Sequence, residues 1–241
     1  MEKRRRETEA FLRVLKYFTP FQWAKILVVT FFTICFATVE QDRSQAYVIA
    51  SSLASICGIV SVVLGSIGRA AQFYWGVVSV VAYIFISWSS RLFGEVMLSA
   101  LYYLPMQFLG FYLWKRNANG AGKKRITPRK LPSSATPVIW GSTVVAIIIY
   151  RDLLAMLGGA AVWLDSTTTV CSIVGNALMV LRYREQWPIW IVVDALTVIM
   201  WARVGNPIMT TTWAVYLINA IYGHVLWKRY LNDQTSQTDL N

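Results

Sequence analysis

The sequence carries one fourteen-residue pattern twice. Residues 103–116 read YLPMQFLGFYLWKR and residues 216–229 read YLINAIYGHVLWKR, an offset of 113 residues. Seven of the fourteen positions are identical, including a glycine in the middle and a closing Trp-Lys-Arg. Both copies are apolar until they end in two basic residues. The repeat therefore predicts a fold built from two related halves.

The composition places this fold in a membrane. The chain has 241 residues, of which 56% are hydrophobic and 15% charged, and its mean hydropathy is +0.47. A soluble domain would carry about 25% charged residues. The 11 tryptophans and 12 tyrosines suit membrane interfaces. We predict a polytopic all-α membrane protein that binds membrane lipid; its basic residues lie between apolar segments, which argues against a nucleic-acid partner.

Eight segments are long and apolar enough to be membrane spans, which take roughly 20 residues each. Eight spans divide the loops into two sets, of which one would hold 18 of the 23 lysines and arginines. The other would hold only Arg43, Arg91 and Arg203. Since lysine and arginine accumulate in cytoplasmic loops, both termini are predicted to be cytoplasmic. The predicted spans are 23–39, 46–67, 72–89, 96–114, 138–157, 160–181, 187–203 and 208–227.

The repeat also orders these spans. Moving the second, third and fourth spans by 113 residues places each of them on one of the last three. Three-helix units reverse direction, so a single linker helix gives both units the same orientation, as in parallel repeats of transporters. The predicted organisation is a leading segment 1–45, a three-helix bundle 46–114, a basic loop 115–137, a linker helix 138–158, a second bundle 159–229 and a polar tail 230–241.

The segments between and beyond the spans are expected to be simple. The loop 115–137 reads as a solvated, topology-setting loop near anionic lipid. Residues 1–22 are basic and partly amphipathic and are expected on the membrane surface. The tail from residue 230 is expected to be disordered.

Polar residues inside spans mark the faces that avoid lipid, because polar groups in hydrocarbon are costly. At 100° per residue, the polar and aromatic residues of four spans fall within arcs of about 60–80°. Asp194 lies roughly 10 Å deep and is expected to face a wet cavity. The candidate substrate-binding residues are Tyr103, Gln107, Thr169, Asn176, Trp187, Trp190, Asp194, Tyr216, Asn219 and Tyr222.

Other residues on these faces have structural interpretations. Tryptophan near a span end is typical of an interface anchor, which is the expectation for Trp114, Trp187, Trp201 and Trp227. Gly110 and Gly223 are expected to be close-packing contacts between helices.

The two copies of the repeat disagree at informative positions. Asn219 replaces Met106, and Asp194 replaces Val81, so the second bundle carries polar groups where the first is apolar. At one pair of positions the first bundle is the more polar, because Gln107 corresponds to Ala220. A cavity between the bundles is therefore expected to be lined mainly by the second bundle, with Gln107 facing it. Aromatic, amide and carboxylate groups together suit a planar polar solute, and a cationic ring gains further from the π face.

Several enzyme classes lack their motifs in this chain. It shows no P-loop glycine motif and no HExxH sequence. The single His224 and the three cysteines, all within apolar spans, have neither metal-ligand spacing nor a disulfide framework. We therefore expect no enzyme activity, no catalytic residue, no metal and no cofactor.

The run GEVMLSALYYLPMQFLGFYLWKR at 94–116, with Gly76, Glu185 and Gly223-x-x-x-Trp227, resembles the Pnu-type vitamin transporters over roughly residues 46–229. The resemblance implies a fold related to the SWEET transporters, a homotrimer, and facilitated diffusion of nicotinamide riboside across a bacterial inner membrane, followed by cytoplasmic phosphorylation toward NAD.

The same resemblance assigns roles within the site. A family pattern W-x-x-W-x-x-x-N matches at Trp187 and Trp190, which would stack on the ring, while Asp194 stands in place of the amide. Ser79 and Gln72 also stand where asparagine is expected. Thiamine or a (deoxy)nucleoside therefore stays open as substrate on the same fold, and a membrane sensor without transport is a further alternative.

Overall fold

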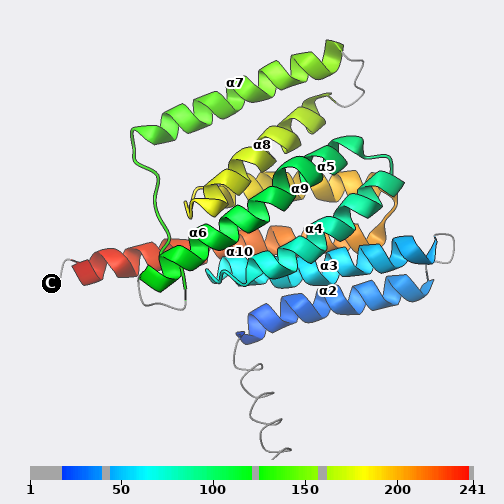
Figure 1. Ribbon diagram of the computed structural model, residues 1–241, viewed down its shortest axis with the longest axis horizontal. Coiled ribbons are helices and arrows are strands. Elements are labelled where there is room, and N and C mark those ends of the chain that lie inside the picture. The colour runs from blue at the N-terminus through cyan, green and yellow to red at the C-terminus, as the bar shows by residue number, and fades with distance from the viewer. Residues whose placement is uncertain (1–17, 40–43, 121–124, 157–161, 239–241) are drawn as a thin grey trace, which may run out of the picture.

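In the computed structural model the chain is described over residues 18–39, 44–120, 125–156 and 162–238, and the regular structure there is helical. Most of the predicted surface segment 1–22 lies outside these residues. Figure 1 shows the helices running side by side in alternating directions. They are α2 (Pro20–Val39), α3 (Gln45–Ser66), α4 (Gln72–Ser89), α5 (Phe93–Leu98), a π-helical turn (Ser99–Tyr103), α6 (Leu104–Gly120), α7 (Ala135–Met156), α8 (Val162–Val180), α9 (Gln186–Val204) and α10 (Pro207–Thr238). The tail predicted to be disordered is thus helical as far as Thr238.

Capping residues explain where several helices begin and end. The Ser44 hydroxyl accepts a hydrogen bond from the backbone N–H of Tyr47 at the start of α3. The Asn206 side chain accepts one from the N–H of Met209, 2.9 Å away, at the start of α10. Gly205 ends α9 with a φ of +71°, a conformation that glycine adopts without the steric cost of a Cβ.

The span that contains α5 and α6 is interrupted by the π-helical turn, and Pro105 explains it. Proline has no N–H to donate to the carbonyl four residues earlier, and its ring crowds the preceding turn. The turn Ser99–Tyr103 widens instead. Ser99, Tyr103 and Gln107 then follow one another at four-residue spacing, so one face of this span presents all three.

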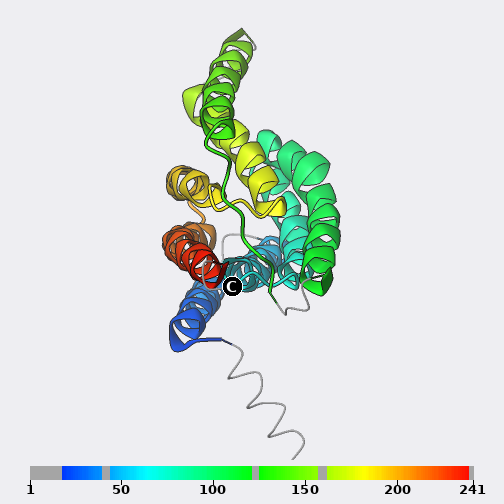
Figure 2. The ribbon, with the colours of Figure 1, turned by 90° about the vertical axis from the view of Figure 1, so that its left-hand side faces the viewer.

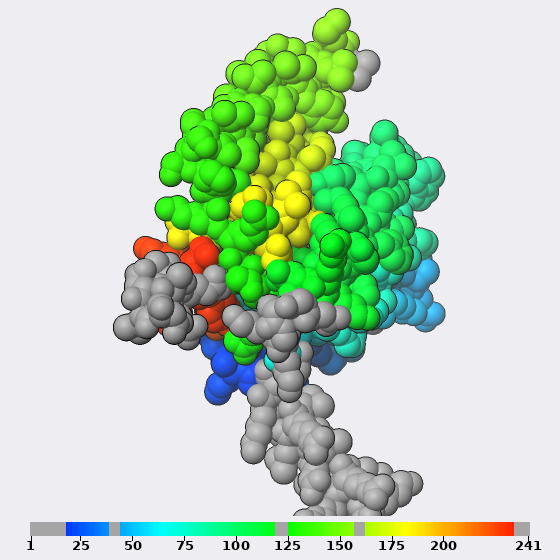
Figure 3. Space-filling model, turned by 60° about the vertical axis from the view of Figure 1, so that its left-hand side comes forward, coloured from blue at the N-terminus to red at the C-terminus, as the bar shows by residue number. Residues whose placement is uncertain are grey.

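Six spans close into a ring. Around it, α3 packs on α4, α4 on α6, α6 on α8, α8 on α9, α9 on α10, and α10 on α3. The leading helix α2 packs outside the ring on α3 and α10, as Figure 2 shows from one end. The linker helix α7 packs along α8 at the edge of the molecule (Figure 3). The leading helix followed by a three-one-three arrangement is therefore confirmed, and the two bundles meet at an α3–α10 seam and an α6–α8 seam.

Six helical segments of the described chain are long and apolar enough to cross a membrane: α2, α3, α4, α5 with α6, α7 and α9. This supports a multi-pass membrane protein. The helices α8 and α10 fall outside that group, and both carry rows of threonine with serine or asparagine. Because these rows face the interior of the ring, the polar composition of α8 and α10 reflects what they line.

The repeated Trp-Lys-Arg has a structural meaning at the seams. The Trp114 indole N–H donates to the carbonyls of Met179 and Val180, each 3.2 Å away, across the α6–α8 seam. The Trp227 indole N–H donates to the carbonyl of Ser66, 2.9 Å away, across the α3–α10 seam. Ser66 and Met179 are themselves 113 residues apart. Each bundle therefore caps the first helix of the other bundle with the tryptophan of its last helix.

The prediction that the four tryptophans near span ends are interface anchors is wrong. Trp114, Trp201 and Trp227 are completely buried, and Trp187 is 6% exposed. The ring closes over these residues, so their indole groups face protein instead of lipid headgroups.

The basic loop is also more than a solvated connection. Residues 125–131, here called the strap, cross the end of the ring that carries the Trp-Lys-Arg sequences (Figure 2). The Ile126 N–H donates to the Gly68 carbonyl in the α3–α4 turn, and the Arg129 N–H donates to the Arg182 carbonyl in the α8–α9 turn. The strap thus binds the corresponding turns of both bundles, which a freely solvated loop would not do.

Candidate functional site

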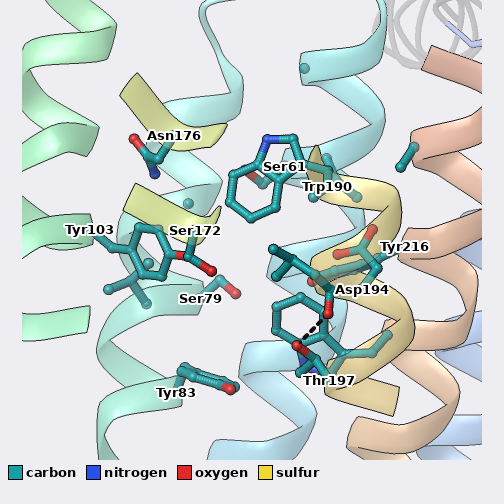
Figure 4. Close-up of a pocket in the computed structure, with 18 of the residues that line it drawn as sticks. Ser61, Ser79, Tyr83, Tyr103, Ser172, Asn176, Trp190, Asp194, Thr197 and Tyr216 are labelled. Atoms are coloured by element: carbon teal, nitrogen blue, oxygen red, sulfur yellow. Dashed lines mark hydrogen bonds between the residues drawn. The ribbon is translucent and has the colours of Figure 1, made fainter. Parts of the chain in front are cut away.

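The ring encloses a cavity of about 180 Å³ (Figure 4). A single water needs only about 10–15 Å³ on the same measure, so the cavity has room for an organic solute. Fourteen of its lining residues come from positions 54–107 and sixteen from positions 168–220. The expectation that the second bundle would line it predominantly is therefore wrong: the first bundle contributes Ser61, Gln72, Ser79, Tyr83, Glu95 and Ser99 in addition to Tyr103 and Gln107.

Eight of the ten candidate residues line this cavity: Tyr103, Gln107, Asn176, Trp187, Trp190, Asp194, Tyr216 and Asn219. Thr169 does not, and its neighbour Thr168, about 100° away on α8, takes that place. Tyr222 does not either. Six residues after Tyr216 its side chain has turned about 120° away, and it meets Phe21 of α2 with ring centroids 5.1 Å apart.

Two tryptophans of α9 form an aromatic wall, and glycines of the neighbouring helices hold them in place. A Cβ added to Gly223 would lie 2.5–2.6 Å from the Trp187 ring. A Cβ on Gly175 would make an ordinary contact of 3.4 Å with the Trp190 ring, and its closest neighbour, at 3.0 Å, would be the Ile189 side chain. Trp187 also packs edge-on against Trp227, at 5.5 Å between centroids. Gly223 was predicted to be a close-packing contact, and it does admit a neighbouring side chain.

Glycines also leave room for polar side chains that line the cavity. A Cβ on Gly76 would lie 2.3 Å from the Gln107 side-chain oxygen, so glycine at this position of α4 leaves room for the Gln107 amide as it stands in the cavity. A Cβ on Gly58 would meet both the Tyr216 hydroxyl and the Ser79 hydroxyl. Figure 4 shows Tyr216 and Ser79 approaching the cavity from different helices. Small residues therefore set which side chains project inward.

The cavity contains carboxylates and no basic side chain. Asp194 is 4% exposed, has no hydrogen-bond or ion-pair partner among the described residues, and lines the cavity together with Tyr103 and Tyr216. Glu95 accepts a hydrogen bond from the Tyr83 hydroxyl, 3.2 Å away. Among the described lining residues there is no lysine, arginine or histidine. In a chain of net charge +11, the acidic groups of the described lining therefore have no basic counterpart in the cavity.

Several buried polar atoms around the cavity have no hydrogen-bond partner among the described residues. Buried polar groups are normally satisfied, so such atoms are suited to meet a bound solute. They offer both donors and an acceptor: Gln72 Nε2, Gln186 Nε2, Trp187 Nε1, Ser99 Oγ and Asn176 Oδ1.

Sequence reasoning missed a group of lining residues that includes Glu95, Tyr83 and Thr168. Glu95 stands one position outside the predicted span 96–114, and α5 begins earlier, at Phe93. An ionisable residue at the edge of a span was the available signal. Tyr83 gave no signal of its own, because its role depends on Glu95 and on the Trp201 indole N–H, which donates to the Tyr83 hydroxyl at 3.1 Å.

Comparisons with known proteins agree with this architecture. Residues 48–229 match the family described as nicotinamide mononucleotide transporter. The chain is 34% identical to the nicotinamide riboside transporter PnuC of Neisseria mucosa over 78% of this chain and 74% of that protein. It is 32% identical to the protein of that name from Haemophilus influenzae, over 73% and 78% respectively. The crystal structure of the vitamin B3 transporter PnuC superposes with a TM-score of 0.76 at 30% identity, covering 90% of this chain and 94% of that one.

Proposed function

The chain belongs to the nicotinamide mononucleotide transporter family, and we propose that it carries nicotinamide riboside across the membrane by facilitated diffusion. Two observations support nicotinamide riboside as the substrate: the names of the relatives and the character of the cavity. Transport would feed NAD synthesis once the riboside is phosphorylated in the cytoplasm.

The observation that carries the proposal is the pairing of aromatic walls with unpaired carboxylate in one cavity. Nicotinamide riboside presents a planar pyridinium ring with a positive charge. The faces of Trp187 and Trp190 suit such a ring, because a cation over an aromatic face gains roughly 0.5–2 kcal/mol. Asp194 supplies the opposite charge within the same cavity.

The absence of basic side chains from the described lining separates the riboside from the mononucleotide. A phosphate group is normally bound by arginine, lysine or a helix N-terminus. Nicotinamide mononucleotide would bring its phosphate into a cavity that offers Asp194 and Glu95 instead. The cavity therefore favours the dephosphorylated form.

Within this proposal, different polar residues bind the different polar groups of the riboside. Gln107, Asn176 and the unpartnered amides of Gln72 and Gln186 would bind the carboxamide and the ribose hydroxyls, a role supported by their place in the cavity lining. Tyr103 and Tyr216 occupy corresponding positions of the two bundles and border the cavity from opposite sides. Passage would follow from rocking of one bundle against the other around the bound solute.

Calorimetry and flux with the purified full chain test this function. Proteoliposomes should take up labelled nicotinamide riboside to equilibrium and no further, and unlabelled riboside should compete at micromolar concentration. Nicotinamide mononucleotide should compete poorly. Micromolar binding of thiamine, also a cation, or of a deoxynucleoside, with none of the riboside, would reassign the substrate. Riboside binding without flux would make the chain a sensor.

We further propose that both termini are cytoplasmic in a bacterial inner membrane and that the protein is a homotrimer. The asymmetry of lysine and arginine supports the orientation. The helix α7 supports assembly. Among the described helices it packs substantially on α8 alone, and only 6% of its membrane-spanning length is buried within the protomer. Labelling of single cysteines from each side and the mass of the detergent-free particle test the two statements.

A further inference from the structure

Lys25 of the leading helix is buried beside the cavity, at a position the family match does not cover. Its side chain is 4% exposed, and the family match begins only at residue 48. The Lys25 ammonium donates a hydrogen bond to the Asn219 side-chain oxygen and lies 4.3 Å from the centre of the Tyr222 ring. It has no carboxylate partner among the described residues. A buried lysine without an anion is costly, so its contact with Asn219 needs a reason.

The contact fixes the orientation of the Asn219 amide. An ammonium group can only donate, so the atom that faces Lys25 must be the amide oxygen. A carbonyl can only accept, so the atom that faces the Val62 carbonyl, 3.0 Å away, must be the amide nitrogen. The Lys25 ammonium and the Val62 carbonyl together therefore set the orientation of the Asn219 amide.

Asn219 then has one polar group left for the cavity that it lines. Its nitrogen carries two hydrogens, of which Val62 takes one. We propose that Lys25 is a positioning residue that makes Asn219 a hydrogen-bond donor toward an acceptor oxygen of the transported solute. This rests on the proposed function, because nicotinamide riboside offers such oxygens in its carboxamide and ribose. The positive charge at the amide oxygen also strengthens the remaining N–H as a donor.

The docking of α2 does not depend on Lys25 alone. Farther along the same helix, the Thr33 hydroxyl lies 3.0 Å from the Ser55 hydroxyl of α3. Ser55 in turn bonds to Thr212 of α10. Gln22 of α2 donates to the Tyr222 hydroxyl at 3.5 Å. Because these contacts remain when Lys25 is replaced, a change at Lys25 can be read as a change in Asn219.

The first experiment compares Lys25→Met with Lys25→Arg and with the matched control Gln22→Leu. Gln22 is 3% exposed and donates to Tyr222 of α10, but none of its hydrogen bonds within the described structure goes to a cavity-lining residue. Lys25→Met should weaken riboside binding by about tenfold, the value of one well-placed hydrogen bond. Lys25→Arg should retain more affinity than Lys25→Met, and Gln22→Leu should bind like the parent chain. The maximal flux should change less than KM in every variant.

A double-mutant cycle with Asn219→Ala then asks whether Lys25 acts through Asn219. In the Asn219→Ala background, Lys25→Met should cause no further loss of affinity. Asn219→Ala leaves the buried Lys25 ammonium without its acceptor, so Lys25→Met should also restore any thermal stability lost in that way. Additive losses, or equal losses for Lys25→Met and Gln22→Leu, would show that Lys25 only docks the helix. Unchanged affinity in Lys25→Met would also overturn the inference. Failure of the parent chain to bind riboside would instead reject the proposed function.

Discussion

Replacing Gly223 with alanine should disturb the cavity wall through Trp187. The added Cβ would lie 2.5–2.6 Å from three carbons of the Trp187 ring, against an ordinary contact of 3.4–4 Å. The ring must therefore move by about 1 Å. It cannot do so freely, because Trp187 is 6% exposed and packs against the completely buried Trp227.

The expected magnitude combines two opposing effects. Overpacking in a well-packed core costs about 1–3 kcal/mol. Alanine in place of a helical glycine regains roughly 0.5–1 kcal/mol. The net loss therefore lies between about 0 and 2.5 kcal/mol. Its middle value of about 1 kcal/mol should lower the apparent melting temperature by about 2–4 °C, at about 2–4 °C per kcal/mol. A displacement of this size at a stacking residue should weaken riboside binding by about tenfold or more.

Thermal unfolding in detergent followed by tryptophan fluorescence, together with calorimetric titration of the riboside, measures both effects. The matched control is Gly141→Ala in α7, where an added Cβ has no neighbour within 4 Å among the described residues. That variant should be as stable as the parent chain or slightly more stable, with unchanged binding. If Gly223→Ala behaves like Gly141→Ala, the absence of a Cβ at position 223 does not hold Trp187.

Three further substitutions test the seam and the cavity. Asp194→Asn should lower the affinity for the cationic riboside at least tenfold and leave neutral nucleosides nearly unaffected in competition assays; equal losses would contradict the electrostatic reading. Trp227→Phe removes the bond to the Ser66 carbonyl and should cost about 1–3 kcal/mol in thermal unfolding, unless that carbonyl finds water. Thr168→Val should raise KM more than Thr169→Val does in flux assays, since only Thr168 lines the cavity, and the reverse order would place the wall elsewhere.

The fold could be predicted from the sequence because the repeat and the charges constrain it independently. Hydropathy alone identifies six helical segments of the described chain as candidate membrane spans and leaves out α8 and α10. The 113-residue offset locates the two polar spans anyway, because each corresponds to an apolar span of the first bundle. The strap could not be predicted, because its contacts with Gly68 and Arg182 are backbone hydrogen bonds that any residue can make.

The site could be predicted only where helical periodicity decides which face is buried. Asp194 and Trp190 lie within one uninterrupted α-helix, α9, and their placement follows from 100° per residue. Glu95 lies one position before the predicted span 96–114, so the periodicity of that span could not place it in the cavity. Lys25 and Asn219 are 194 positions apart in the sequence, so no local sequence pattern predicts their hydrogen bond.

The comparison of the two repeat copies separates structural from cavity positions. Identical pairs divide in two: the tryptophans Trp114 and Trp227 cap the opposite bundle, whereas Tyr103 and Tyr216 both line the cavity. Of the differing pairs, Gln107 and Ala220 both line it as well, whereas Asn219 does and Met106 does not. A difference between copies therefore becomes informative when both positions face the cavity. Gln107 presents an amide to the cavity where its counterpart Ala220 presents a methyl group, so the two bundles offer a solute different groups at corresponding positions.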